Sequence, residues 1–586
     1  MQRTNYCGLI NEQYLDQSVS IFGWVHRRRD LGGVIFLDIR DKEGIVQAII
    51  EPNTEFFKIA EEIKHEYVIL VEGIVKKRFS PNLDLKNGNI EIVATKIEIL
   101  NTSKPIPILI DDSTTSENNR MLHRIIDLRG HKMQNNLRLR HKVTSIIRRF
   151  LDNNEFIDIE TPFLTKTTPG GAKDFLVASS VNRGYFYALP QSPQIFKQLL
   201  MVSGFDRYYQ IVKCFRDEAL RADRQPEFTQ IDIETSFLDE FEIRNIIESL
   251  FKSVCKEVLN IEFDKLAVIT YNEAMSLYGS DKPDLRIPLK FIDLTYELKN
   301  SSFKVFNQVN EYKKGKIISL KLPDNVNLSR KEIDNYTDYI KTFGASGMAY
   351  IKINDINQLN ENGLQSPIVK FLTQEELASI INKTEAKNGE TILFVVNSEK
   401  VAYASMGALR LKLGHDKKLY TCQWAPLWVV DFPLFEYDEE KKVYTACHHP
   451  FTSPKDEHID LLITQPESCY AKAYDLVLNG SELGGGSVRI YRADIQSKIF
   501  EAMGISDIEA QDKFGFLLEN LQYGAPPHGG FAFGLDRWVS LLVGADSIRD
   551  VIAFPKTTTG QCLLTNAPSQ VSQEQLQDIG VKLIKD

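Results

Sequence analysis

Cysteine is scarce in this chain. Seven cysteines are scattered over 586 residues, their number is odd, and no two of them form a Cys-x-x-Cys pair. This distribution argues against a disulfide framework and fits a protein kept in a reducing compartment. We therefore expect the protein to be cytoplasmic.

Long apolar runs are also missing. No run approaches the roughly 18 to 20 residues that a membrane-spanning helix needs. The first residues, MQRTNYCGLI, contain no charged segment followed by an apolar one, so the sequence predicts no signal peptide. We expect a soluble protein with no membrane partner.

The sequence also lacks an excess of positive charge. The formal net charge is −9, which argues against non-specific binding to polyanions but leaves room for a local basic patch. Hydrophobic residues (43%) and charged residues (25%) occur at the levels typical of globular proteins. The length exceeds what one core can organise, so roughly three to four domains are expected.

The first 105 residues contain short β-rich runs with a helical insert at 55–64. Five strands and one helix predict an OB-fold barrel, a fold that binds single-stranded nucleic acid. The basic run His26-Arg27-Arg28-Arg29, with Phe36 nearby, suits unpaired bases. Taken alone, the same run is more typical of a solvated charged surface. The strand runs are Val19–Val25, Val34–Ile39, Ile45–Ile50, Tyr67–Val75 and Ile90–Ile99.

The stretch Phe205–Phe237 predicts a strand, a polar loop and a second strand. Alternation along the second strand places Phe228, Gln230, Asp232 and Glu234 on one face. An arginine, acids, an amide and an aromatic ring then converge on one wall. On the pattern alone, a solvent-facing side of an antiparallel sheet is the alternative.

This stretch resembles motif 2 of the class II aminoacyl-tRNA synthetases, in the form found in bacterial aspartyl-tRNA synthetases. Phe215-Arg216-Asp217-Glu218 matches its Phe-Arg-x-Glu core. The segment 137–162 resembles motif 1, the dimer interface, and Gly529–Arg537 resembles motif 3. The resemblance spans essentially the whole chain and implies a multidomain α+β fold. Its expected parts are an OB-fold anticodon-binding barrel (1–105), a hinge (106–135), an antiparallel catalytic sheet in two parts (136–284 and 421–586) and an inserted α+β domain (285–420).

The resemblance implies an aspartate–tRNA ligase that uses ATP, Mg²⁺, L-aspartate and tRNA(Asp) and forms a homodimer. Arg216 and Arg537 would be catalytic, holding the α- and γ-phosphates. Aspartate contacts are implied for Gly170, Gln194, Ile195, Phe196, Lys197, Arg216, Asp232, His448 and Arg489. ATP contacts are implied for Arg216, Asp217, Glu218, Gln225, Phe228, Glu482, Gly534, Leu535, Asp536 and Arg537. Anticodon contacts are implied for Arg29, Phe36, Gln47, Asn82 and Glu91.

Asp475 and Glu482 lie on either side of Asn479-Gly480, so a turn between two strands would bring them together. Hard oxygen ligands near a triphosphate suit Mg²⁺, and the resemblance assigns this pair to it. The neighbouring Cys447-His448-His449-Pro450 does not predict a zinc site, because no further ligand pair is near.

One position departs from the family pattern. The loop 167–172 commonly reads Pro-Glu-Gly in the family, and Gly170 stands where its substrate-binding glutamate is expected. Another acid, such as Asp232, would then hold the ammonium group, or aspartate would bind more weakly.

Three alternative functions are compatible with these features. The enzyme could charge both tRNA(Asp) and tRNA(Asn), and it could be a non-catalytic tRNA-binding paralogue, which Gly170 alone supports. An ATP-dependent asparagine synthetase is a related possibility, but such relatives lack the N-terminal barrel.

Overall fold

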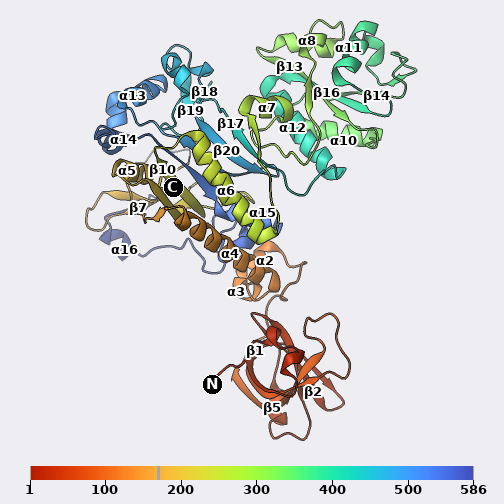
Figure 1. The fold of residues 1–586 in the computed structure, drawn as a ribbon, viewed down its shortest axis with the longest axis vertical. Coiled ribbons are helices and arrows are strands. Elements are labelled where there is room, and N and C mark those ends of the chain that lie inside the picture. The colour runs from red at the N-terminus through yellow and green to blue at the C-terminus, as the bar shows by residue number, and fades with distance from the viewer. Residues whose placement is uncertain (1, 168–171, 585–586) are drawn as a thin grey trace. The chain divides into compact units, whose positions relative to one another are not determined.

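The computed structural model describes residues 2–167 and 172–584 (Figure 1). It divides into two compact units, Met1–Arg138 with Ile552–Ser569, and Leu139–Val551 with Gln570–Asp586. The domain boundaries expected from sequence assigned all of 421–586 to the catalytic part, and they stay a prediction. Among the residues described, no helix combines the length and apolar composition that crossing a membrane requires.

The N-terminal strands close into a barrel, as the sequence predicts. Aliphatic side chains at alternate positions fill it, which is the period-two pattern of strands with one buried face. Helix α1 (Phe57–Glu62) connects β3 to β4. In the barrel order the strands are β1 (Ser18–Leu31), β2 (Val34–Asp41), β3 (Gly44–Ile50), β5 (Ile90–Asn101) and β4 (Val68–Lys77).

Strand β1 is longer than the sequence predicts. The expected strand ended at Val25, but pairing with β2 continues to Leu31 after a register shift between Val25 and Arg27. A bulge of this kind bends a strand without ending it. The basic run therefore lies within a strand of the barrel.

The expected hinge contains two short helices, α2 (Glu117–Leu122) and α3 (Arg124–Asp127). Buried Arg124 donates hydrogen bonds to the carbonyl oxygens of Ile552 at 2.7 Å and Ala553 at 2.9 Å. These bonds explain why a segment from near the C-terminus belongs to the first unit.

The second unit is built on an eight-stranded sheet, antiparallel except at its two edge pairs, β11–β17 and β6–β9. Two separate hairpins are formed by β7 (Leu176–Ala178) with β8 (Phe186–Ala188), and by β18 (Phe435–Asp438) with β19 (Val443–Ala446). In order, the strands of the large sheet are β11 (Ala267–Thr270), β17 (Pro426–Val430), β20 (Ala473–Leu478), β21 (Ser481–Val488), β22 (His528–Gly534), β10 (Glu227–Ser236), β9 (Arg207–Phe215) and β6 (Ile157–Asp158).

Helices cover this sheet and connect its strands. Helix α6 begins with a capping box between Asp239 and Glu242, and its Phe251 stacks on Trp538 of α15 at 6.0 Å. The helices are α4 (His131–Asn153), α5 (Gln194–Val202), α6 (Glu240–Leu259), α7 (Tyr271–Tyr278), α13 (Ala493–Ala502), α14 (Asp507–Leu521), α15 (Leu535–Val543) and α16 (Gln573–Asp578).

The segment expected to be an inserted α+β domain forms its own five-stranded sheet with a hydrophobic core on each face (Figure 1). One core contains residues of α10 and α12, and the other contains residues of α8 and α11. The strands are β12 (Phe291–Asp293), β13 (Gly315–Leu322), β16 (Thr391–Ser398), β14 (Ala349–Ile353) and β15 (Leu364–Gln365). The helices are α8 (Thr295–Leu298), α9 (Lys304–Asn307), α10 (Arg330–Lys341), α11 (Gln374–Thr384) and α12 (Glu399–Asp416).

Candidate active site

Strands β9 and β10 pair antiparallel from Phe215 opposite Glu227 to Arg207 opposite Thr235, with a loop between them. This confirms the strand–loop–strand prediction. The guanidinium of Arg216, in the loop, lies over the ring of Phe228 at 5.0 Å from its centroid. A planar cation and an aromatic face are thus presented together, next to each other on one wall.

A cavity of about 640 Å³ lies against this wall. It brings together residues that are far apart in the sequence, from the β9–β10 loop, β10, the β19–β20 connection, β20, β21 and α15. The predicted site residues that line it are Arg216, Glu218, Gln225, Phe228, His448, Asp475, Glu482, Gly534, Asp536 and Arg537.

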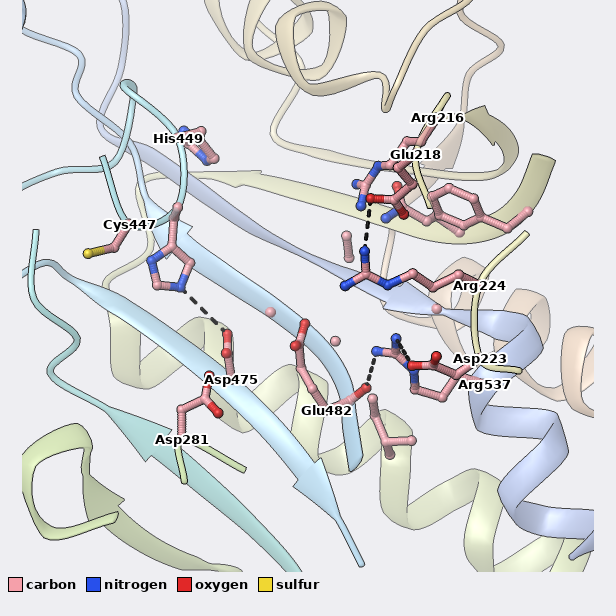
Figure 2. A pocket seen from close by; sticks show the side chains of 18 of the residues that line it. Arg216, Glu218, Asp223, Arg224, Asp281, Cys447, His449, Asp475, Glu482 and Arg537 are labelled. Atoms are coloured by element: carbon pink, nitrogen blue, oxygen red, sulfur yellow. Dashed lines mark hydrogen bonds and ion pairs between the residues drawn. The ribbon is translucent and has the colours of Figure 1, made fainter. Parts of the chain in front are cut away.

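Three guanidinium groups gather on one side of the cavity, facing carboxylates (Figure 2). Arg537 donates to the Glu482 carbonyl oxygen at 2.8 Å and approaches Asp223 at 3.5 Å. Arg224 pairs with Glu218 at 3.0 Å. The sequence reasoning missed Arg224 and Asp223, because charged residues in a polar loop carry no signal of where they point.

The two acids assigned to Mg²⁺ meet as the turn predicts. Strands β20 and β21 form a hairpin, and Asp475 and Glu482 both line the cavity. The neighbouring Asp475 charge, followed by burial, raises the pKa of Glu482 above its usual value. Two neighbouring carboxylates that line one cavity supply the hard oxygen ligands that a divalent cation prefers.

A third acid at this end was not predicted. Asp281 also lines the cavity and raises the pKa of Glu482 further (Figure 2). It follows α7 in a loop that buried Arg410 holds by donating to the carbonyl oxygens of Asp284 and Ile287, at 2.8 and 2.6 Å. Arg410 belongs to the inserted domain, a long-range contact that local patterns do not reveal.

A second cavity of about 530 Å³ shares Arg216, Glu218 and His448 with the first. Gln194, with Ile195 and Phe196, lines it at the start of α5. The two cavities therefore adjoin at Arg216 and His448.

The expected substrate cations Lys197 and Arg489 are buried and already paired with protein acids. Lys197 Nζ lies 3.1 Å from Asp232 and 3.4 Å from Glu234. Arg489 donates to Glu234 at 2.9 and 3.1 Å, and its Nη1 lies 2.7 Å from His449 Nε2. Neither cation is among the described residues that line the two cavities, so their substrate contacts stay a prediction.

The pKa values of the acids and of the histidine in this buried network are shifted in different directions. Burial raises the pKa of Asp232, although Lys197 opposes the shift. Burial alone would also raise the pKa of Glu234, but Arg489 and Lys197 hold it below its usual value. Burial, followed by the charge of Arg489, places the pKa of His449 well below its usual value, so this ring is neutral at pH 7.

Two buried polar atoms in this region have no hydrogen-bond partner among the described residues: Asp232 Oδ2 and Gln194 Nε2. Buried polar atoms are almost always satisfied in native proteins, so each of these atoms is a candidate ligand contact. Gln194 lines the second cavity, whereas Asp232 is not among the described residues that line either cavity. A carboxylate oxygen accepts from a cation such as ammonium, and an amide nitrogen donates to an oxygen.

Other predicted residues have different surroundings. Asp536 is buried and accepts hydrogen bonds from Arg140 and from the Thr229 backbone N–H, so it also connects α15 to α4 and β10. Leu535 is buried, the backbone of Asp217 bonds to Lys173, and neither is among the described residues lining the cavities. Gly170 lies outside the described residues. His449, passed over in favour of His448, lines both cavities.

The predicted anticodon residues form a cluster on the barrel. Gln47 Oε1 accepts from Arg29 at 3.0 Å and from Arg78 at 2.7 Å, and Gln47 Nε2 donates to Glu91 at 2.8 Å. The Arg29 guanidinium lies 6.0 Å from the Phe36 ring centroid. Arg78 was not predicted.

Asn82 has a local role in the loop between β4 and β5. Its backbone N–H donates to the Gly88 carbonyl oxygen at 3.0 Å, and its side-chain oxygen accepts from the Asp84 N–H at 3.0 Å. These bonds shape the loop and do not extend to the Gln47 cluster.

One described group in the barrel, His26, His65 and Glu66, has ligand atoms within 4.8 Å of one another. Glu66 already accepts hydrogen bonds from Arg40 at 2.9 Å and Arg129 at 2.7 Å. Two guanidinium groups oppose a further cation at this carboxylate. We therefore assign Glu66 to attaching the hinge to the barrel.

Family comparisons agree with this geometry. Residues 116–558 match the family of tRNA synthetases class II (D, K and N). The chain belongs to this family. Residues 19–100 match the OB-fold nucleic acid binding domain. This class II synthetase therefore has a tRNA-binding barrel that precedes an ATP-using catalytic region in the sequence.

Solved structures share the fold of this class II synthetase at low sequence identity. The asparaginyl-tRNA synthetase of Pyrococcus horikoshii complexed with asparaginyl-adenylate is 18% identical, with a TM-score of 0.59, and the match covers 95% of this chain and 98% of that one. The aspartyl-tRNA synthetase of Entamoeba histolytica is 18% identical, with a TM-score of 0.56, over 93% of this chain and 89% of that one. These structures include an asparaginyl and an aspartyl enzyme, so the likeness supports the fold and does not decide which amino acid this synthetase uses.

Proposed function

We propose that this synthetase is a bacterial-type aspartate–tRNA ligase. The observation that carries the proposal is the unpartnered Asp232 Oδ2 beside a network with two buried cations, Lys197 and Arg489. Asp232 suits an α-ammonium group. Lys197 and Arg489, now paired with Asp232 and Glu234, would exchange part of that pairing for a substrate side chain that carries negative charge. L-Aspartate has both groups.

In the first step, an oxygen of the aspartate α-carboxylate attacks the α-phosphorus of ATP. The bond from that phosphorus to the bridging oxygen breaks, and pyrophosphate leaves. Phe228 offers a face for the adenine ring, while Arg216 and Arg537 approach the phosphates with fixed positive charge. Cations already in place at a developing charge lower a barrier without reorganisation, and alignment of the reactants supplies much of the rest.

In the second step, a ribose hydroxyl oxygen of the terminal tRNA adenosine attacks the aspartyl carbonyl carbon. The bond from this carbon to the phosphate oxygen breaks, AMP leaves, and the hydroxyl proton passes to a phosphate oxygen. Neither step uses a protein nucleophile, which agrees with raised thiol pKa values such as that of Cys447, raised to about 11 by burial.

We propose Mg²⁺ as the cofactor, held by Asp475 and Glu482. When bound, it would neutralise charge on the triphosphate and hold the leaving pyrophosphate. The residues themselves provide the oxygen donors, and Arg537, which lines the same cavity and bonds the Glu482 carbonyl, limits the negative charge at this end.

Asparagine is the second candidate, since an asparaginyl enzyme is among the similar structures. Its side-chain amide carries no charge to match Lys197 and Arg489. Stable sulfamoyl analogues of the two adenylates separate the candidates in a calorimetric titration. We expect the aspartyl analogue to bind at least about 100-fold more tightly, from roughly 3 kcal/mol of charge-assisted bonding. Equal binding, or preference for the asparaginyl analogue, would remove the assignment to aspartate.

We further propose a homodimer that charges tRNA(Asp). Exposed apolar side chains of Ile157, Phe163 and Leu164 lie in and next to the motif-1 segment and support a partner surface there. Sedimentation equilibrium checks the dimer, and a monomer at micromolar concentration contradicts it. Charging purified tRNA(Asp) and tRNA(Asn) side by side checks the choice of tRNA.

A further inference from the structure

The loop between β4 and β5 of the barrel exposes two large apolar side chains. Phe79 has a relative exposure of 104% and Leu83 one of 91%. Scattered exposed apolar residues are common, but a fully exposed phenylalanine together with a second apolar side chain on one loop indicates a contact surface.

This loop has a defined shape that keeps the ring exposed. The Arg78 backbone N–H donates to Asn89 at 2.9 Å, and that of Asn82 donates to Gly88 at 3.0 Å. A Cβ on Gly88 would lie 1.7 Å from the Asn82 carbonyl oxygen, so only glycine allows this close approach. Phe79 is therefore exposed on a loop whose shape is fixed by backbone hydrogen bonds.

Phe79 follows directly in the chain after a residue that contacts the predicted anticodon cluster. Arg78, the residue directly before it, donates to Gln47 Oε1 at 2.7 Å, and Arg29 donates to the same oxygen at 3.0 Å. The loop between the fourth and fifth strands is one of the two loops with which OB-folds contact oligonucleotides. The other is the β1–β2 turn, where Leu31 is also exposed.

The surroundings indicate the chemistry of the partner. Lys77 and Arg78 precede the ring and suit a phosphate backbone, whereas Lys76 is paired with Asp16 at 2.6 Å. Gln47 and Glu91 are buried and bonded to each other, so the partly exposed guanidinium of Arg29 is the group of this cluster that offers donors to a base edge. A ring next to such cations matches single-stranded RNA, whose bases stack on aromatic faces.

We propose that Phe79 is a further tRNA-recognition residue, which stacks on an unpaired base of the anticodon loop. The proposal rests on the proposed function for the identity of the tRNA, and it adds a contact outside the predicted set Arg29, Phe36, Gln47, Asn82 and Glu91. Leu83 covers the neighbouring part of the same loop and contributes apolar contact without a π-face.

The first test is Phe79→Ala in the full-length enzyme, compared with Phe79→Trp. We expect Phe79→Ala to raise KM for tRNA(Asp) by about 10-fold or more, with little change in kcat, because stacking on an aromatic ring contributes strongly to binding of each base. Phe79→Trp restores KM. An unchanged KM in Phe79→Ala, or a Phe79→Trp enzyme as impaired as the alanine variant, would overturn the proposal.

The second test is spectroscopic. A synthetic anticodon stem-loop of tRNA(Asp) should quench the added tryptophan fluorescence of Phe79→Trp, while the same stem closed by a compact tetraloop should not. Quenching by both RNAs, or by neither, contradicts stacking on an unpaired anticodon base.

Two matched variants serve as controls. Leu83→Ala removes apolar surface from the same loop and should raise KM less than Phe79→Ala, whereas an equal effect would indicate general apolar contact and contradict stacking. Phe371→Ala removes an exposed ring of the inserted domain and should leave KM for tRNA(Asp) unaltered. Aspartate-dependent ATP–pyrophosphate exchange tests the proposed function separately, and Phe79→Ala should leave its rate unaltered.

Discussion

At the scale of single residues, burial decides which groups carry charge. His449 and His528 are both buried, and burial lowers the pKa of each below 6.5, with the charge of Arg489 acting in the same direction. The folded protein therefore keeps both rings neutral at a pH where the unfolded chain would protonate them.

This sets a pH dependence of stability with a definite sign. The stabilising contribution of these neutral rings is fully present above pH 6.5 and is lost as the pH falls below it, because only the unfolded chain then binds the protons. We expect the free energy of unfolding to fall by at most about 1.4 kcal/mol per pH unit for each histidine below that point. Urea denaturation between pH 7.5 and 5.5 measures it. His528→Asn should flatten the slope, and an equally steep slope would contradict the assignment.

Asp232 is the residue with the most direct prediction for substrate binding. Replacing it with asparagine removes the negative charge and turns one of its two acceptor oxygens into a donor. We expect KM for aspartate to rise by about 10- to 100-fold from the loss of a charge-assisted hydrogen bond. KM for ATP, which Asp232 does not contact in our account, is the internal control. Pyrophosphate exchange measures both constants, and a parallel rise in the two would point to general damage.

At the scale of elements, the β20–β21 hairpin positions the acids of the site. Gly485 lies opposite Asp475, and a Cβ at Gly485 would lie 2.3 Å from Asp475 Oδ1. The glycine therefore allows the carboxylate its position against the strand.

Gly485→Ala should displace the Asp475 side chain without changing the fold. We expect kcat of pyrophosphate exchange to fall by about 10-fold or more and the Mg²⁺ concentration for half-maximal rate to rise, in line with a 1 to 2 kcal/mol loss of positioning. Gly347→Ala is the matched control, because a Cβ there meets nothing within 4 Å. Equal activity of the two variants would contradict this role.

Sequence patterns predicted the elements whose pairing is local. The β9–β10 and β20–β21 hairpins follow from strand composition and a turn, and both bring their site residues together. Strand β1 was predicted too short, because a bulge after Val25 is fixed by pairing with β2 and not by composition.

The remaining differences come from contacts between distant segments. Lys197 and Arg489 were expected to face substrate. The sequence could not indicate that Asp232 and Glu234, which are distant in the sequence, would already pair with them. The same holds for Asp281, whose loop is held by Arg410 from the inserted domain, and for the segment 552–569, which Arg124 binds from the hinge.

At the scale of the whole molecule, our proposal assigns adenylate formation and tRNA recognition to different units. Gln47→Ala removes the group that joins Arg29, Arg78 and Glu91 on the barrel. We expect kcat/KM for tRNA to fall by about 10-fold while pyrophosphate exchange is unchanged, because the lost bonds involve charged groups used only for tRNA. Loss of both activities together would contradict this division of labour.

In our account, one sheet-built pocket holds ATP beside aspartate and joins the α-phosphate to the aspartate carboxylate. Pyrophosphate exchange, run in parallel with aspartate, asparagine and lysine as the only amino acid, measures this most directly. Our account predicts exchange with aspartate alone and its loss by about 1,000-fold or more in Arg216→Ala, from roughly 4 kcal/mol of transition-state stabilisation. Exchange driven by asparagine or lysine, or an Arg216→Ala enzyme of normal rate, would contradict it.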